Sequence, residues 1–170
     1  MQVATLPQCT PDERLVYKKF VKDTKGDHRY LRGDRWIEIK RIITTYKLKK
    51  ALEFGSGIST ILFPLNGLSL VSCETDEKYM EFVRTLAAPT VDFRLWDNLV
   101  SPLRHDERFD IGLVDGILPR NKQAELAIKH CRFVVLDDSV RDIKRSLWAL
   151  FTPYKRVDLE TTIVSIFKIH

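Results

Sequence analysis

Hydrophobic and polar positions along the chain follow two different periods. Short apolar runs such as KALEF (50–54) and RFVVLD (132–137) are typical of buried strands. Segments between them carry apolar residues three or four positions apart, which is the spacing of an amphipathic helix. Trp36, Ile39, Ile43 and Tyr46 show this spacing after Asp34, a residue type suited to begin a helix. The pattern therefore predicts strands that alternate with helices.

The same pattern predicts the order of the elements and hence the fold class. Alternation of strands and helices favours a parallel sheet covered on both faces. The last two strands leave no room for a crossover helix, so they must be antiparallel. The predicted fold class is α/β, with a doubly wound, mostly parallel seven-stranded sheet, an antiparallel last strand and helices on both faces. The predicted strands are 50–54, 68–74, 90–96, 109–115, 132–137, 154–160 and 161–169, and the predicted helices are 13–22, 34–46, 59–65, 76–87, 121–131 and 139–151.

Domain organisation is simple, because 170 residues suit one domain and no repeat or linker interrupts them. We expect a main domain at 34–170 and a helical N-terminal extension at 1–33, whose polar loop GDHRYLRGD (26–34) is a candidate lid. The three cysteines show neither metal spacing nor a disulfide framework. No apolar run is long enough for a membrane span, and the N-terminus lacks a signal-peptide pattern. We therefore expect a reduced, cytoplasmic protein with no membrane partner.

The net charge of +5 is unevenly distributed, because residues 11–50 hold 13 Lys and Arg against 6 Asp and Glu. A basic segment of this kind attracts anionic partners, nucleic acid among them. The alternative is that these lysines and arginines only solvate the outer faces of helices, and average charge does not decide between the two.

An acid lies at or just beyond the end of five predicted strands. Because the carboxyl ends of parallel strands meet at one edge of a sheet, these side chains share the edge where such folds bind ligands. The first strand runs into the turn Gly55-Ser56-Gly57, and Glu74 follows about 20 residues later. Glycines let the backbone approach a ligand, and an acid at that distance is placed to bind ribose hydroxyls. This spacing points to a nucleoside-containing cofactor. The strand-end acids are Glu53, Glu74, Asp97, Asp115 and the pair Asp137-Asp138.

Over about residues 34–170 the chain resembles small class I S-adenosylmethionine-dependent methyltransferases. LEFGSGIST resembles the first motif of that family, VSCETDEKY the second strand with its ribose-binding acid, and LWDN the adenine-contacting segment. FDIGLVDG, FVVLDDS and TTIVSIFKI resemble the fourth, fifth and reversed last strands.

The resemblance implies a role for each matching residue. Glu53 would lie near the ammonium group of S-adenosylmethionine, Glu74 would hold its ribose and Asp97 its adenine amino group. Asp115 would lie near the transferred methyl or the methionine end. Three of these acids have structural alternatives, since Glu53 suits capping of a backbone amide, Asp97 suits a turn and Glu74 suits the N-terminal end of the next helix. Beneath the methionine part would pass Gly55, Ser56 and Gly57, with Ser59 counted among the cofactor-binding residues.

Asp115, Asp137 and Asp138 also resemble the metal triad of catechol-type O-methyltransferases, which implies a Mg²⁺ site with Asp115 and Asp138 as catalytic residues. Oxygen ligands of this type suit a hard cation. Two departures weaken the match: the catechol group has Asn where Asp138 stands, and a Lys where Leu118 stands. The structural alternative is that Asp138 caps the helix that begins at Ser139.

We expect an enzyme that methylates a hydroxyl of a small-molecule or sugar-like acceptor, with or without a metal, as a monomer or a homodimer. The Asn/Asp-Pro-Pro-Tyr and Pro-Cys motifs of base-modifying methyltransferases are absent from the sequence. A nucleic-acid or nucleotide methyltransferase that uses the basic N-terminal region is the first alternative. A non-catalytic partner-binding protein with the same fold is the second.

Overall fold

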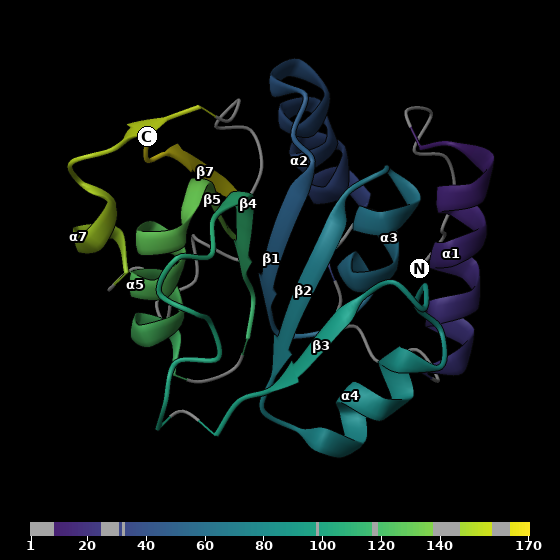
Figure 1. Cartoon of the computed structure of the whole chain (residues 1–170). Coiled ribbons are helices and arrows are strands. Elements are labelled where there is room, and N and C mark those ends of the chain that lie inside the picture. Colours follow the sequence, from purple (N-terminus) through teal and green to yellow (C-terminus); the bar gives the residue numbers. More distant parts are fainter. Residues whose placement is uncertain are drawn as a thin grey trace.

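The computed structural model describes residues 9–24, 31, 33–97, 99–116, 119–137, 147–157 and 164–170. The chain alternates strands and helices from residue 33 onward (Figure 1). The helices are α1 (Pro11–Asp23), α2 (Gly33–Tyr46), α3 (Ser59–Leu65), α4 (Glu77–Arg84), α5 (Arg120–His130) and α7 (Trp148–Phe151). The strands are β1 (Lys50–Phe54), β2 (Ser69–Glu74), β3 (Asp92–Leu95), β4 (Phe109–Val114), β5 (Cys131–Leu136), β6 (Lys155–Arg156) and β7 (Ser165–Lys168).

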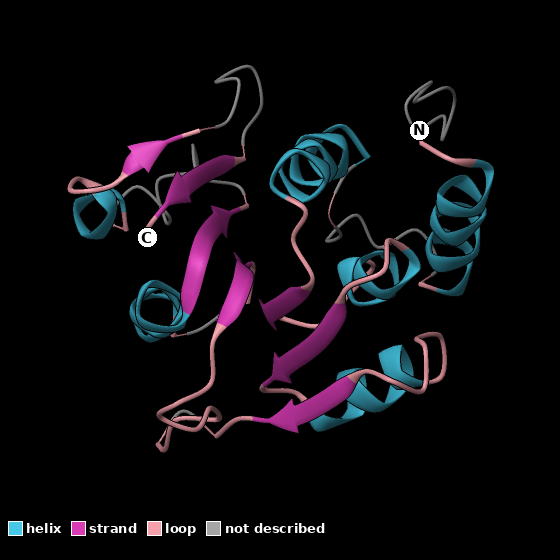
Figure 2. Ribbon diagram, turned by 45° about the horizontal axis from the view of Figure 1, so that its top comes forward, coloured by secondary structure: helices cyan, strands magenta, loops and turns pink. Residues whose placement is uncertain are grey.

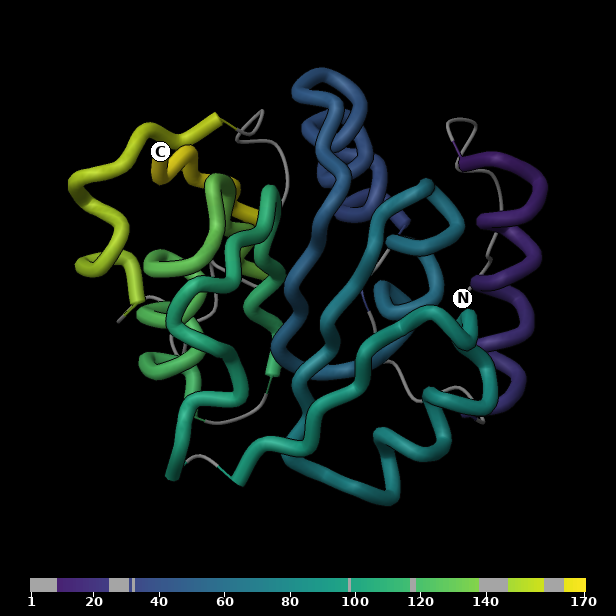
Figure 3. The backbone as a smooth tube through the Cα atoms, viewed as in Figure 1, coloured from purple at the N-terminus to yellow at the C-terminus, as the bar shows by residue number. Residues whose placement is uncertain are grey.

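The described strands form one seven-stranded sheet in the order β3-β2-β1-β4-β5-β7-β6. Pairs among β1 to β5 are parallel, and β7 runs antiparallel to both β5 and β6. The chain winds outward from β1 to β3 and then returns to begin a second half at β4 (Figure 3). The strand order therefore reverses between β1 and β4, which is where doubly wound sheets bind their ligands.

Both faces of the sheet are covered by helices (Figure 2). Alternate residues of β4 point to opposite faces, so that Ile111 and Leu113 pack with α1, α2 and α3, whereas Val114 packs with α5 and α7. The buried strands consequently read as nearly continuous apolar runs rather than as alternating ones. Tyr17 and Phe20 of α1 belong to the same core as the strands.

Most predicted elements are confirmed, and β1 and α3 match to the residue. Helix α1 begins earlier than predicted, because Thr10 and Glu13 form a capping box that the sequence analysis missed. Helix α4 ends at Arg84 instead of residue 87, ahead of Pro89, which cannot continue a helix. The candidate lid at 26–34 and the predicted helix at 139–151 lie largely outside the described residues. No described helix is long and apolar enough to cross a bilayer.

Candidate functional site

The turn after β1 lies at the point where the strand order reverses. Gly55 has a φ of +93°, which is the left-handed region that favours glycine. Its amide donates to the Cys73 carbonyl, 2.9 Å away, and its α-carbon faces the backbone after β4. A Cβ on Gly55 would lie 2.7 Å from the Gly116 Cα, so the two strand ends touch through their glycines.

Gly57 differs from Gly55 because it borders open space. A Cβ on Gly57 would meet no atom within 4 Å. Between the two glycines, the Ser56 amide donates to the Glu74 carboxylate at 2.9 Å. The turn is thus packed against the residues that follow β4 and is hydrogen-bonded to the end of β2, while Gly57 borders open space.

Glu53 lies beneath this turn and is completely buried. Its carboxylate accepts hydrogen bonds from the Ser59 hydroxyl, the Thr60 hydroxyl at 2.6 Å and the Ser72 hydroxyl at 2.8 Å. The Ser72 hydroxyl also lies 2.9 Å from that of Ser56. In the structure the carboxylate of Glu53 is thus surrounded by hydroxyl donors, and its place near the ammonium group of S-adenosylmethionine stays a prediction. Glu53 is therefore linked to the turn through Ser72, whose hydroxyl contacts both Glu53 and Ser56. The hydroxyl of Ser59, which was predicted to bind the cofactor, donates to Glu53.

Burial raises the pKa of Glu53 to about 7, because the hydrogen bonds from three hydroxyls, which lower the pKa, do not offset the lost hydration. The nearby negative charge of Asp115 also raises the pKa of Glu53. Between the ordinary value of 4.5 and about 7, the folded protein keeps a proton that the unfolded chain releases. The free energy of unfolding should therefore fall as pH rises through this window, by about 3 kcal/mol, and then level off. Urea unfolding at pH 5 to 8 measures the fall. Glu53→Gln, which mimics the protonated acid, should show a flatter profile than wild type, and parallel profiles would contradict this assignment.

Glu74 and Asp97 lie at the ends of the next two strands. The Glu74 carboxylate is partly exposed, and it accepts from the Ser56, Thr75 and Asp76 amides at 2.9, 2.6 and 3.1 Å. Asp97 is exposed, and its Oδ1 accepts from the Leu99 amide at 2.9 Å, which is the turn role that was its structural alternative. Glu74 thus contacts the turn directly, whereas Asp97 follows β3, one strand farther along the same edge of the sheet.

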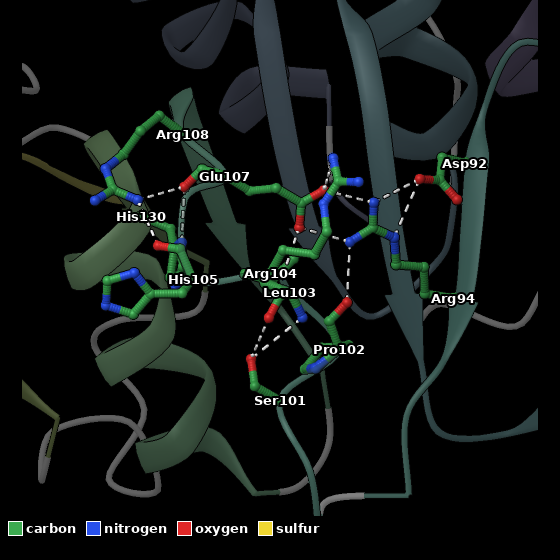
Figure 4. A network of polar contacts seen from close by, with 10 residues as sticks. All are labelled: Asp92, Arg94, Ser101, Pro102, Leu103, Arg104, His105, Glu107, Arg108 and His130. Carbon is green, nitrogen blue, oxygen red and sulfur yellow. Dashed lines mark hydrogen bonds and ion pairs between the residues drawn. The ribbon is translucent and has the colours of Figure 1, made fainter.

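An ion-pair network fixes the loop that carries Asp97 (Figure 4). Arg94 of β3 donates to Asp92, to the Pro102 carbonyl and to both oxygens of Glu107, each at 2.7–3.1 Å. The Arg94 hydrogen bonds hold the Glu107 pKa at about 2. His130 of α5 is buried, and its Nδ1 lies 2.8 Å from the Glu107 carbonyl. The loop between β3 and β4 is therefore tied at both ends.

Asp115 follows β4 beside the glycine turn. Its amide donates to the Phe54 carbonyl at 3.0 Å, which continues the pairing of β4 with β1, and its side chain is half-buried. Gly116 comes next, packed against the buried side chain of Gln123 in α5. Gln123 is a residue that the sequence analysis missed. Among the described residues, none bonds to its Oε1.

Asp137 follows β5 and pairs with Arg35 of α2. Arg35 Nη1 lies 2.8 Å from Oδ1 and 2.7 Å from Oδ2 of Asp137, and both side chains are buried. In the part of the chain that the structure describes, no three His, Cys, Asp or Glu residues gather to hold a metal ion. Asp138, the third residue of the expected metal triad, lies outside the described residues. The described residues therefore give no support to the expected Mg²⁺ site, and they pair Asp137 with Arg35.

The sequence placed Arg35 only among the residues of the basic N-terminal region and did not predict its pairing with Asp137. Arg35 lies next to Trp36 on the apolar side of α2, and Glu38 one turn later is buried as well. The sequence indicates the burial of Arg35 and Glu38 only through their place beside the apolar stripe of α2. It does not reveal that Asp137 is the partner of Arg35.

Comparisons with solved structures agree on the fold over nearly the whole chain. A candidate O-methyltransferase from Klebsiella pneumoniae aligns with a TM-score of 0.73 at 16% identity, covering 97% of this chain and 92% of that one. An O-methyltransferase from Bacillus cereus in complex with S-adenosylhomocysteine gives 0.71 at 16% identity, covering 96% and 93%. A methyltransferase from Podospora anserina bound to S-adenosylhomocysteine gives 0.67 at 12% identity, covering 94% and 88%.

No protein-family model and no curated protein matches the sequence. The likeness is therefore one of fold, at 12–16% identity in these three structures. The chain has the class I S-adenosylmethionine-dependent methyltransferase fold.

Proposed function

We propose that this protein binds S-adenosylmethionine at the turn after β1 and transfers its methyl group to a hydroxyl of a small-molecule or sugar-like acceptor. The observation that carries the proposal is the contrast between the two glycines of the turn. Gly55 is packed against Gly116, whereas Gly57 borders open space beside the partly exposed Glu74. A nucleoside-containing ligand needs a glycine backbone that it can approach closely and a nearby carboxylate that binds its ribose hydroxyls.

The cofactor would supply an electrophilic methyl group, and the chain would position the two reactants. Glu74 would hold the ribose hydroxyls through Oε2, which accepts only from the Ser56 amide among the described residues, whereas Oε1 already accepts from Thr75 and Asp76. Asp97 would face the adenine amino group. Asp115 would lie nearest the acceptor and take the proton of its hydroxyl, as a general base at the end of β4. Asp138 is proposed as a second catalytic residue on sequence alone, since it lies outside the described residues.

A small acceptor is favoured over a nucleic acid by the names of the structural neighbours, which include O-methyltransferases. The exposed lysines of α1 keep the nucleic-acid alternative open. A nucleic-acid acceptor bound through these lysines would show activity that falls steeply with salt, whereas a small neutral acceptor would not. The lysines are Lys18, Lys19 and Lys22.

The proposal is tested by calorimetric titration with S-adenosylhomocysteine and S-adenosylmethionine. We expect Glu74→Ala to weaken binding of both by about tenfold or more, the scale of a lost hydrogen bond to a charged group. Glu77→Ala, which removes an exposed carboxylate three residues away on α4, is the matched control and should leave the affinity unchanged. Absence of binding to the wild-type protein would overturn the cofactor assignment and favour the partner-binding alternative.

A further inference from the structure

The loop that follows β3 holds two large apolar side chains in solvent. Leu99 is 84% exposed and Val100 is 74% exposed. Their backbone is held by hydrogen bonds, because the Leu99 amide donates to Asp97 Oδ1 at 2.9 Å and Trp96 Nε1 donates to the Val100 carbonyl at 2.8 Å. The Arg94 network fixes the loop farther along (Figure 4). Leu99 and Val100 therefore form an apolar projection at a fixed position.

A cavity of about 290 Å³ lies beside this projection, between the loop and α5. Trp96 and Leu126 supply apolar lining, and Leu99 and Val100 border the cavity. The volume is about ten times the share of one water molecule, about 30 Å³, so the cavity can take apolar side chains of another molecule. The projection and the cavity thus adjoin each other on one face of the protein.

The α5 wall of the cavity carries two opposite charges. Glu125 and Lys129 both line the cavity, and both are exposed. They are four residues apart, a spacing at which ion pairs form along a helix. Among the described residues, however, no ion pair joins them to each other or to any other side chain. A partner that presents a base and an acid in the opposite order would pair with both.

A second copy of this chain meets each of these requirements. A projection needs a cavity on its partner, and this chain carries both on the same face. In a two-fold dimer one face meets itself, so each projection can enter the cavity of the other copy. With the two-fold axis across α5, the two α5 helices are antiparallel, and Glu125 of each copy lies opposite Lys129 of the other. A small ligand would fill the cavity and leave the projection in water.

We propose that Leu99, Val100 and the exposed face of α5 form the interface of a homodimer, in which a second copy of this chain fills the cavity. The inference is independent of the proposed methyl transfer. A patch confined to one loop and one helix face belongs to the small end of specific interfaces, so we expect a dissociation constant of roughly 1–100 µM. Since Asp97 begins the loop, the dimer would also hold the segment predicted to face the adenine.

The experiment is sedimentation equilibrium of the whole chain at concentrations that bracket this range. The weight-average mass of the wild type should rise from 19.8 kDa toward twice that value. Val100→Asp should raise the dissociation constant by about tenfold or more, because it brings a charge into an apolar cavity. Leu15→Asp is the matched control, since Leu15 is 65% exposed on α1, and it should leave the dissociation constant unchanged within about twofold.

Exchange of the two charges identifies the second copy as the partner. Glu125→Lys and Lys129→Glu should each weaken self-association by about tenfold or more, because like charges then face each other at both contacts. An equimolar mixture of the two variants should associate within about threefold of the wild-type affinity. In the mixed dimer each contact again joins an acid to a base.

A wild-type protein that stays monomeric at the highest concentration would overturn the proposal, and the cavity would then belong to a different partner. A dimer that Val100→Asp and Leu15→Asp weaken equally would overturn it as well, because the interface would lie elsewhere. So would a mixture of the two charge variants that associates no better than either variant alone. All substituted positions are exposed, so the fold should be kept, and circular dichroism of each variant checks this.

Discussion

Gly55→Ala is expected to lower the free energy of unfolding by about 3 kcal/mol, because two penalties coincide at this position. The φ of +93° is unfavourable for any residue with a Cβ. The new Cβ would also lie 2.7 Å from both the Cα and the N of Gly116, and 3.1 Å from the Asp115 carbonyl carbon. All three are backbone atoms, which cannot rotate away, so β1 and β4 would have to separate at their ends. Urea unfolding of the wild type and of Gly55→Ala measures this loss of stability.

Two other glycines provide matched controls for this prediction. Gly67→Ala introduces a Cβ at a φ of +79° in open space, so it reports the backbone penalty alone, about 1 kcal/mol. Gly57→Ala introduces a Cβ with neither penalty, and it should leave stability nearly unchanged while weakening S-adenosylhomocysteine binding by about tenfold or more. Equal destabilisation by the substitutions at Gly55 and Gly67 would show that the contact with Gly116 is not tight.

The contrast between the two glycines of the turn also shows how far the sequence predicts the site. The run KALEF, the turn and the helix STILFPL could be located because period, turn residues and length all agree. The same pattern correctly predicted one edge for the strand-end acids, since parallel strands leave no other arrangement. Which glycine is packed and which is open depends on the register of β1 against β4, and no local pattern contains that register.

Partners of charged side chains were predicted less well than the elements that carry them. Glu53 was predicted to lie near the ammonium group of a ligand, and the sequence did not reveal that it is buried and that three hydroxyls from α3 and β2 donate to it. Arg35 and Asp137 are 102 residues apart in the chain, so their pairing exists only once α2 has packed across the sheet. A metal triad drawn from sequence resemblance could not anticipate an arginine supplied by another element.

Glu13→Ala is expected to lower the free energy of unfolding by about 3–5 kcal/mol, the range for removing one partner of a buried ion pair. The Glu13 carboxylate is fully buried and joins three helices. It accepts from Trp36 Nε1 at 2.9 Å and Lys40 Nζ at 2.8 Å on α2, and from Asn66 Nδ2 at 3.1 Å at the end of α3. It also accepts from the Thr10 amide at 2.7 Å, which closes the capping box of α1. Truncation leaves all four donors without this acceptor.

Acid titration distinguishes this charge from a merely polar contact. Burial acts to raise the pKa of Glu13, but the hydrogen bonds from Lys40, Trp36, Thr10 and Asn66 outweigh it and hold the pKa at about 2. The folded state therefore stays ionised where the unfolded chain, near 4.5, takes up a proton, and the stabilisation is lost as pH falls from about 4.5 toward 2. The free energy of unfolding of Glu13→Gln should fall less between pH 4.5 and 2 than that of the wild type. Asp12→Ala, at the exposed neighbouring position, should show the same pH dependence as the wild type. If Glu13→Ala were as stable as Asp12→Ala, α1 would be held by its apolar contacts alone, and Tyr17 and Phe20 would account for its packing on α3.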